Sequence, residues 1–146
     1  MRYYEADPVG HTIAFDGVSE VVQRFDKLGL KQGVCTNKFE RPSRMILEHL
    51  KLMPPISDLA GADTFPVRKP DPKHILLLLE RMGGTPERAI MVGDSIHDVE
   101  AAHGAGLPAV LVSWGYTDRP ASELGAEAVI ERFDALPQAL ERLANR

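Results

Sequence analysis

Apolar residues along the chain fall into two recurring patterns, one with helical spacing and one of short unbroken runs. The helical spacing predicts helices over 18–28, 42–50, 73–82, 98–105 and 135–144. The unbroken runs predict strands over 33–36, 56–60, 89–92, 109–112 and 128–130. Strands and helices alternate, and the strands lack alternating polar positions, which is typical of a parallel sheet covered on both faces. We therefore expect an α/β fold with a Rossmann-like, doubly wound, mainly parallel sheet and helices on both faces.

Length, charge and cysteine content narrow the class of protein. The 146 residues suit one domain, and the formal charge of −4 gives no basic footprint for a nucleic acid. No apolar run is long enough to span a membrane, and the N-terminal residues lack the apolar core of a signal peptide. The single cysteine, Cys35, excludes an internal disulfide framework and indicates a reducing compartment. We expect a cytoplasmic protein that binds neither nucleic acid nor membrane.

Polar residues follow the expected strands at the edge where ligands bind in such sheets. Thr36 and Asn37 end the first strong strand, Lys69 precedes the third helix, and Asp94 and Asp98 follow the 89–92 strand. Two carboxylates suit Mg²⁺, which takes oxygen ligands and keeps several waters. A lysine, a hydroxyl and an amide suit phosphoryl oxygens. Together these residues would stabilise the negative charge that spreads during phosphoryl transfer.

Each of these residues also has a purely structural interpretation when taken alone. Thr36 and Asn37 could cap a turn, Lys69 could be a solvated surface charge, and Asp94 or Ser95 could cap the following helix. The five histidines do not have the spacing of a zinc site, so we expect surface or helix roles for them. The joint order and spacing of the strand-end residues favour the functional interpretation.

Three segments in order give the chain a resemblance to a known family. Gly33–Lys38, Arg68–Pro72 and Met91–Asp98 resemble the second, third and fourth motifs of haloacid dehalogenase superfamily hydrolases, closest to the phosphoglycolate phosphatase group. Trp114–Tyr116 resembles the loop after the next strand, and the whole resemblance covers roughly residues 14–143. It implies that Thr36 binds the phosphoryl group, that Lys69 holds phosphate and nucleophile, and that Asp94 and Asp98 hold Mg²⁺. The implied substrate is a small phosphorylated metabolite.

The resemblance fails at the motif that carries the chemistry. The family begins with an apolar strand and Asp-x-Asp-Gly-Thr, whose first Asp is the nucleophile and whose second is the general acid and base. No Asp-x-Asp occurs here. Asp16 follows an apolar stretch, but Gly17-Val18 leads straight into the next helix, so we do not expect Asp16 to be the nucleophile. We interpret residues 1–17 as a remnant of a cap or linker and 18–146 as an incomplete core domain.

The missing strand has a structural consequence. In this fold it lies centrally, between the strands that end at Thr36 and Asp94, and unpaired backbone groups there would be costly. We expect the gap to be filled by residues 12–15, by a rearranged sheet, or by a strand from another copy, which would make a homo-oligomer.

Three functions remain open from the sequence. The first is that the chain is the core portion of a Mg²⁺-dependent phosphomonoester hydrolase of the phosphoglycolate phosphatase type, which is inactive in isolation because it lacks the nucleophile. Alternatively, it is a non-catalytic phosphate-binding or regulatory module, or a split enzyme completed by a partner chain.

Overall fold

The computed structural model describes residues 2–3, 17–113 and 120–144. The strands in this part of the chain are β1 (Arg2–Tyr3), β2 (Gly33–Cys35), β3 (Asp58–Ala60), β4 (Met91–Gly93), β5 (Ala109–Val112) and β6 (Ala128–Ile130). The helices are α1 (Val18–Lys27), α2 (Glu40–His49), α3 (Pro72–Met82), α4 (Ile96–Ala105) and α5 (Leu136–Ala144). Every element expected from the sequence is present, with ends shifted by at most two residues. None of the described helices has the length and apolar character that a membrane crossing requires.

Local sequence explains the bounds of α3, the helix that follows Lys69. The Asp71 carboxylate accepts the Lys73 N–H at 2.9 Å, and Pro72 takes the first helical position, where its missing N–H costs nothing. Gly83 ends the helix with φ 76°, in the left-handed region that favours glycine. These signals fix where the helix begins, and with it the position of the loop just before it.

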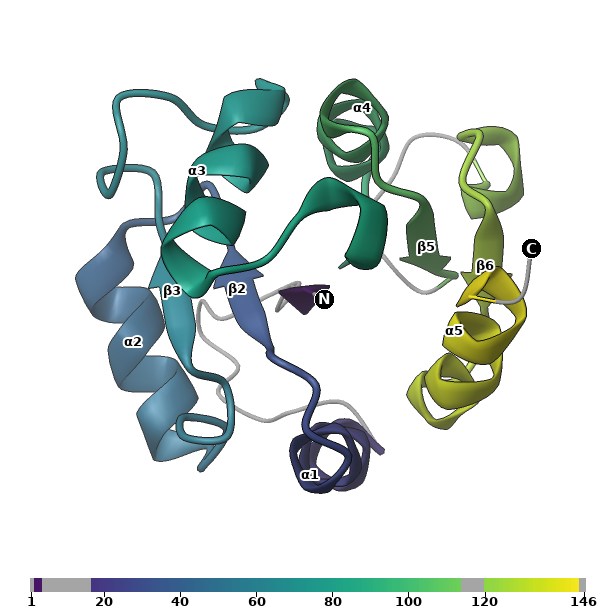
Figure 1. Cartoon of the computed structure of the whole chain (residues 1–146), viewed down its shortest axis with the longest axis horizontal. Helices are drawn as coiled ribbons and strands as arrows, with labels where there is room; N and C mark the ends of the chain where they lie inside the picture. Colours follow the sequence, from purple (N-terminus) through teal and green to yellow (C-terminus); the bar gives the residue numbers. More distant parts are fainter. Residues whose placement is uncertain (1, 4–16, 114–119, 145–146) are drawn as a thin grey trace.

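The sheet is parallel throughout and is covered on both faces. Hydrogen-bonded pairing gives two three-stranded groups in the orders β1-β2-β3 and β4-β5-β6. One apolar cluster joins α1, α2 and α5 to one face, and a second joins α3 and α4 to the other (Figure 1). Successive strand residues alternate between them: Val34 packs into the first cluster and Cys35 contributes to the second. The expected doubly wound α/β fold is confirmed.

Strand β1 lies at the centre of the sheet. Arg2 and Tyr3 pair with Gly33 and Val34 of β2, and on the other side β1 contacts β4 (Figure 1). The central position, for which the sequence offers no family nucleophile strand, is therefore occupied in part by two residues from the start of the chain. The sequence pattern does not predict this segment as a strand, because two residues carry no periodicity. Residues 12–15, expected as one candidate for this position, lie outside the described residues.

Candidate functional site

The Lys69 side chain joins the carboxyl ends of β2 and β4. Its ammonium donates to the Cys35 carbonyl at 2.9 Å and to the Asp98 carboxylate at 2.5 Å. Both side chains of the ion pair are almost fully buried, with 3% and 1% of their surfaces exposed. A buried ion pair is kept only where its charges are well compensated, so Lys69 is not the solvated surface lysine of the structural interpretation.

Asp98 is held by backbone as well as by Lys69. Its second oxygen accepts the Asp94 N–H at 2.9 Å and the Ser95 N–H at 3.2 Å. Ser95 is the residue before α4, so Asp98 also closes the first turn of that helix. A Cβ on Gly93 would lie 2.3 Å from Asp98 Oδ2, so only glycine allows the carboxylate to approach the end of β4 this closely.

The pKa values of the Asp94 and Asp98 carboxyl groups are shifted in opposite directions. Burial, and then the neighbouring Asp98 carboxylate, raise the pKa of Asp94 to about 7. Burial also opposes ionisation of Asp98, but the Lys69 ammonium outweighs it and holds the pKa of Asp98 below its ordinary value. Lys69 therefore neutralises Asp98, whereas its attraction for the Asp94 carboxylate is outweighed by burial and by Asp98. A cation beside Asp94 would favour the ionised form of Asp94.

Thr36 and Asn37 follow the end of β2 and have different roles. Thr36 is buried, and its hydroxyl oxygen accepts the Lys38 N–H at 3.1 Å, which leaves its own O–H to donate. The Asn37 amide binds the main chain of Lys69 on both sides, accepting from its N–H at 3.0 Å and donating to its carbonyl at 2.8 Å. The structure thus places Asn37 against the Lys69 loop, and a direct contact with phosphate stays a prediction.

His74 is a site residue that the sequence analysis missed. It is fully buried on α3, where its Nδ1 accepts the Lys69 N–H at 3.2 Å and its Nε2 lies 3.1 Å from the Gly61 carbonyl. A signal existed: His74 stands four residues before Leu78, which puts it on the apolar face of the helix. A polar residue on a buried face must find hydrogen-bond partners, and here one partner is the lysine loop.

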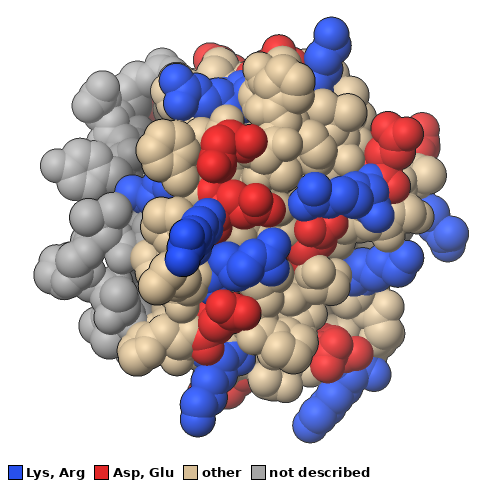
Figure 2. Space-filling model, turned by 90° about the vertical axis from the view of Figure 1, so that its left-hand side faces the viewer, with Lys and Arg blue, Asp and Glu red and all other residues tan. Residues whose placement is uncertain are grey.

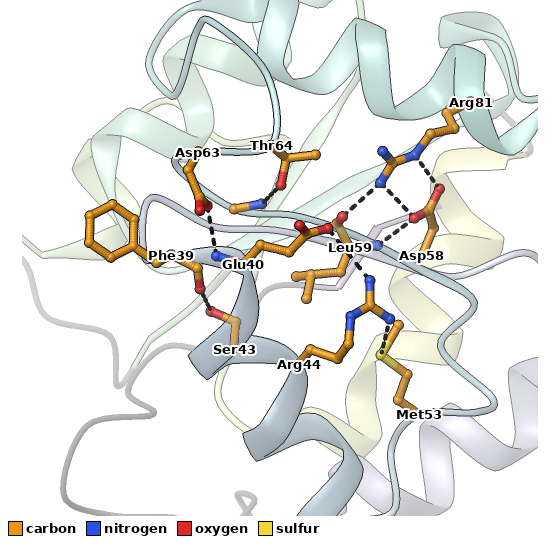
Figure 3. Close-up of polar contacts among 11 residues, drawn as sticks. Phe39, Glu40, Ser43, Arg44, Met53, Asp58, Leu59, Asp63, Thr64 and Arg81 are labelled. Atoms are coloured by element: carbon orange, nitrogen blue, oxygen red, sulfur yellow. Dashed lines mark hydrogen bonds and ion pairs between the residues drawn. The ribbon is translucent and has the colours of Figure 1, made fainter.

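The loop after β3 is fixed to the beginning of α2. The Asp63 carboxylate accepts the Glu40 N–H at 2.9 Å, and the Thr64 hydroxyl accepts the Gly61 N–H at 2.8 Å (Figure 3). A Cβ on Gly61 would lie 2.4 Å from the Glu40 nitrogen, so this close approach also requires glycine. The loop that binds His74 is therefore itself held in place.

A groove of about 330 Å³ opens beside the lysine loop. It is lined by Lys38, Phe39, Pro42, Ile46 and Arg68 among others. Phe39 is 63% exposed, so the groove presents an apolar wall with two cations, directly after the end of β2.

The donor set fits a hard divalent cation. Asp94 and Asp98 offer carboxylate oxygens, and both oxygens of Asp98 already accept hydrogen bonds, from Lys69 and from the Asp94 and Ser95 N–H groups. Within the described ranges, no group of three or more His, Cys, Asp or Glu forms a larger metal site. Mg²⁺ needs only one or two carboxylates with waters, whereas a structural zinc site needs four protein ligands. Asp16 and Trp114–Tyr116 lie outside the described residues.

Comparison with known proteins identifies the same family that the sequence motifs resemble. The model of the haloacid dehalogenase-like hydrolase family matches residues 1–112. A phosphoglycolate phosphatase of Mesorhizobium japonicum is 44% identical over 98% of this chain and 63% of its own length. One of Rhodospirillum rubrum is 41% identical over 93% of this chain and 56% of its own.

A solved structure agrees. The crystal structure of a predicted phosphoglycolate phosphatase from Haemophilus somnus superposes with a TM-score of 0.82 at 26% identity, covering 86% of this chain and 56% of that one. The chain thus spans about three fifths of the length of the two curated relatives. The matched motifs, the parallel sheet and the buried strand-end charges agree, and the chain belongs to the haloacid dehalogenase-like hydrolase family.

Proposed function

We propose that this chain is the core portion of a Mg²⁺-dependent phosphomonoester hydrolase, of the phosphoglycolate phosphatase type. The observation that supports this best is the Lys69 ammonium, which is bound at once to the end of β2 and to Asp98 after β4. It gathers a lysine, a hydroxyl and two carboxylates at the edge of the sheet where α/β proteins bind ligands. The curated relatives described above are phosphoglycolate phosphatases.

Each residue has a distinct proposed role. Thr36 donates its hydroxyl to a phosphoryl oxygen, and Lys69 supplies the fixed positive charge that attracts the phosphate. Asp94 and Asp98 would hold Mg²⁺, which would neutralise negative charge on the phosphoryl oxygens. The groove beside Lys38 and Arg68 gives the rest of a small anionic metabolite a place beside the phosphate.

We further propose that the isolated chain has little or no turnover. The Asp-x-Asp motif is absent from the sequence, and the central strand that should carry it is replaced by β1. Without a carboxylate nucleophile, hydrolysis cannot be split into two easier covalent steps. The same proposal includes the division of the chain, with residues 1–17 as a remnant of a cap or linker and residues 18–146 as the incomplete core. It also includes a cytoplasmic location.

Hydrolysis of p-nitrophenyl phosphate with Mg²⁺ tests the proposal. The chain should bind inorganic phosphate and Mg²⁺ weakly and show no turnover above background. Translation of the DNA upstream of Met1 should reveal an in-frame Asp-x-Asp-Gly-Thr strand, and the longer protein should hydrolyse the substrate and lose this activity in Asp94→Asn.

Two outcomes would contradict parts of this proposal. Phosphate binding without any upstream motif would favour a binding module or a split enzyme completed by a partner. Turnover by the isolated chain that Asp94→Asn abolishes and Asp16→Asn preserves would refute the claim that the missing nucleophile makes the chain inactive.

A further inference from the structure

The main chain of Lys69 is held from two sides by side chains of other elements. Asn37, after β2, binds both its N–H and its carbonyl, at 3.0 and 2.8 Å. His74, on α3, accepts the same N–H at 3.2 Å. The Lys69 main chain is thus tied to the residue after β2 through Asn37 and to α3 through His74.

The His74 ring is itself fixed at its other nitrogen. Nε2 lies 3.1 Å from the Gly61 carbonyl, in the loop after β3. The neutral ring with hydrogen on Nε2 satisfies both contacts, because Nδ1 then accepts and Nε2 donates. Phe65 packs edge-on against the ring, with centroids 6.4 Å apart and planes at 84°.

We propose that His74 is a positioning residue for Lys69, which ties the lysine loop to the loop after β3 and so keeps the ammonium at the phosphate site. This inference rests on the proposed function only for its consequence, phosphate affinity. The geometric part, a hydrogen bond from Lys69 N–H to His74 Nδ1, stands on the structure alone. His74 binds the Lys69 N–H through Nδ1 and the Gly61 carbonyl through Nε2, and so acts through Lys69.

Two substitutions separate the two nitrogens. In His74→Asn the amide oxygen occupies the place of Nδ1 and keeps an acceptor for Lys69 N–H. In His74→Gln the longer side chain reaches the place of Nε2 and keeps a donor for the Gly61 carbonyl. Leu78→Ala is the control, because Leu78 is fully buried on the same helix and its truncation destabilises the core without removing a hydrogen bond.

The readouts are inorganic phosphate affinity by calorimetry, urea unfolding, and NMR of the ¹⁵N-labelled full chain. We expect His74→Gln to weaken phosphate binding about threefold, less than the effect of one whole hydrogen bond, because the Lys69 N–H keeps its Asn37 acceptor. We expect His74→Asn to change phosphate binding less than about 1.5-fold. Leu78→Ala should lower stability and leave phosphate affinity unchanged. In His74→Gln the Lys69 amide and ammonium protons should exchange faster with solvent than in the wild type.

The outcomes distinguish this inference from the proposed function. Phosphate affinity that follows stability across all three variants, or that is unchanged in His74→Gln, would overturn the positioning role. If the wild type binds no phosphate, the proposed function fails, and the Lys69 NMR signals alone decide: unchanged exchange in His74→Gln overturns the inference, and faster exchange upholds it. Should both His74 variants fail to fold, the wild-type ring decides, since ¹⁵N shifts showing hydrogen on Nδ1 would exclude the proposed bond.

Discussion

Among single residues, Lys69 and Asp98 depend on each other most strongly. Both are buried, and each supplies the charge that makes burial of the other tolerable. Lys69→Met leaves the Asp98 carboxylate without its cation and should lower the free energy of unfolding by about 3–5 kcal/mol in urea titrations.

Two variants check this explanation. Lys69→Met combined with Asp98→Asn removes both charges and should lose less stability than Lys69→Met alone. Lys73→Met, at an exposed position of α3, should change stability by less than about 0.5 kcal/mol. An equal loss in Lys69→Met and Lys73→Met would contradict the buried ion pair.

Gly93 is a second residue that depends on Asp98, because the close approach of the Asp98 carboxylate requires glycine at this position. Gly93→Ala forces its Cβ against the carboxylate, which lies 2.3 Å from the ideal Cβ position, and should cost about 1–3 kcal/mol by displacing Asp98 from its donors. Gly84→Ala is the matched control, since the nearest atom to its Cβ is a flexible Leu79 methyl group at 3.3 Å. Urea unfolding compares the two, and an equally small loss would show that Asp98 shifts freely.

The residues of the site could be predicted from sequence to different degrees. Thr36, Lys69, Asp94 and Asp98 were predicted from one rule, that the carboxyl ends of parallel strands meet at one edge, and their roles in binding stay predictions. The role of Asn37 against the Lys69 backbone and the burial of His74 could not, because both depend on where loops from different strands come to lie. Local patterns indicate that such side chains need partners and do not say which partners they find.

Between elements, Asp58 and Arg81 connect β3 to α3. The guanidinium binds the carboxylate through two nitrogens at 2.7 and 2.9 Å and also donates to the Leu59 carbonyl (Figure 3). Arg44 pairs with Glu40 at 3.5 Å on α2. Figure 2 shows acidic and basic side chains interleaved across one face of the molecule. On this face the basic side chains of the described residues do not form one continuous patch.

The Asp58–Arg81 pair predicts a pH dependence. Burial opposes ionisation, but the hydrogen bonds from Arg81 and from the Leu59 N–H outweigh it and lower the pKa of Asp58 below 3.8. Because the pKa of Asp58 is lowered by folding, the ion pair stabilises the fold fully at a pH above the ordinary pKa of an Asp side chain. This stabilisation is lost as the pH falls through the lowered pKa of Asp58 in the folded protein. Because the Arg81 side chain is 41% exposed, we expect only about 0.5–1 kcal/mol.

A double-mutant cycle measures that contribution. Asp58→Asn and Arg81→Gln, alone and combined, should show the coupling in urea unfolding near neutral pH, and the coupling should vanish once acid protonates Asp58. A coupling that is unchanged in acid would mean that the contact is not ionic.

Elements were easier to predict than the connections between them. The helices followed from their apolar spacing, and some also from the glycine that ends them. Helix α1, for example, buries Val18, Val21, Val22 and Phe25 on one face, and Gly29 follows it with φ 79°. Strand β1 was missed, because pairing with β2 and contact with β4 make it a strand, and neither is encoded within two residues.

For the whole molecule, the short length of β1 determines how completely the centre of the sheet is filled. The paired residues are only two, whereas β5 contributes four residues between its neighbours. A poorly filled centre leaves strand edges that can accept another chain, so self-association through the sheet stays a prediction.

Proline at Tyr3 tests whether β1 fills this position. Tyr3→Pro removes a main-chain donor from a strand that has β2 on one side and β4 on the other, and should destabilise the fold and increase self-association. Tyr3→Val keeps the N–H and is the control. Light scattering over a range of protein concentrations should show larger species for Tyr3→Pro than for Tyr3→Val, together with a lower urea midpoint. If the two variants are equally stable and equally monomeric, β1 does not hold the two halves of the sheet together, and another segment must complete its centre.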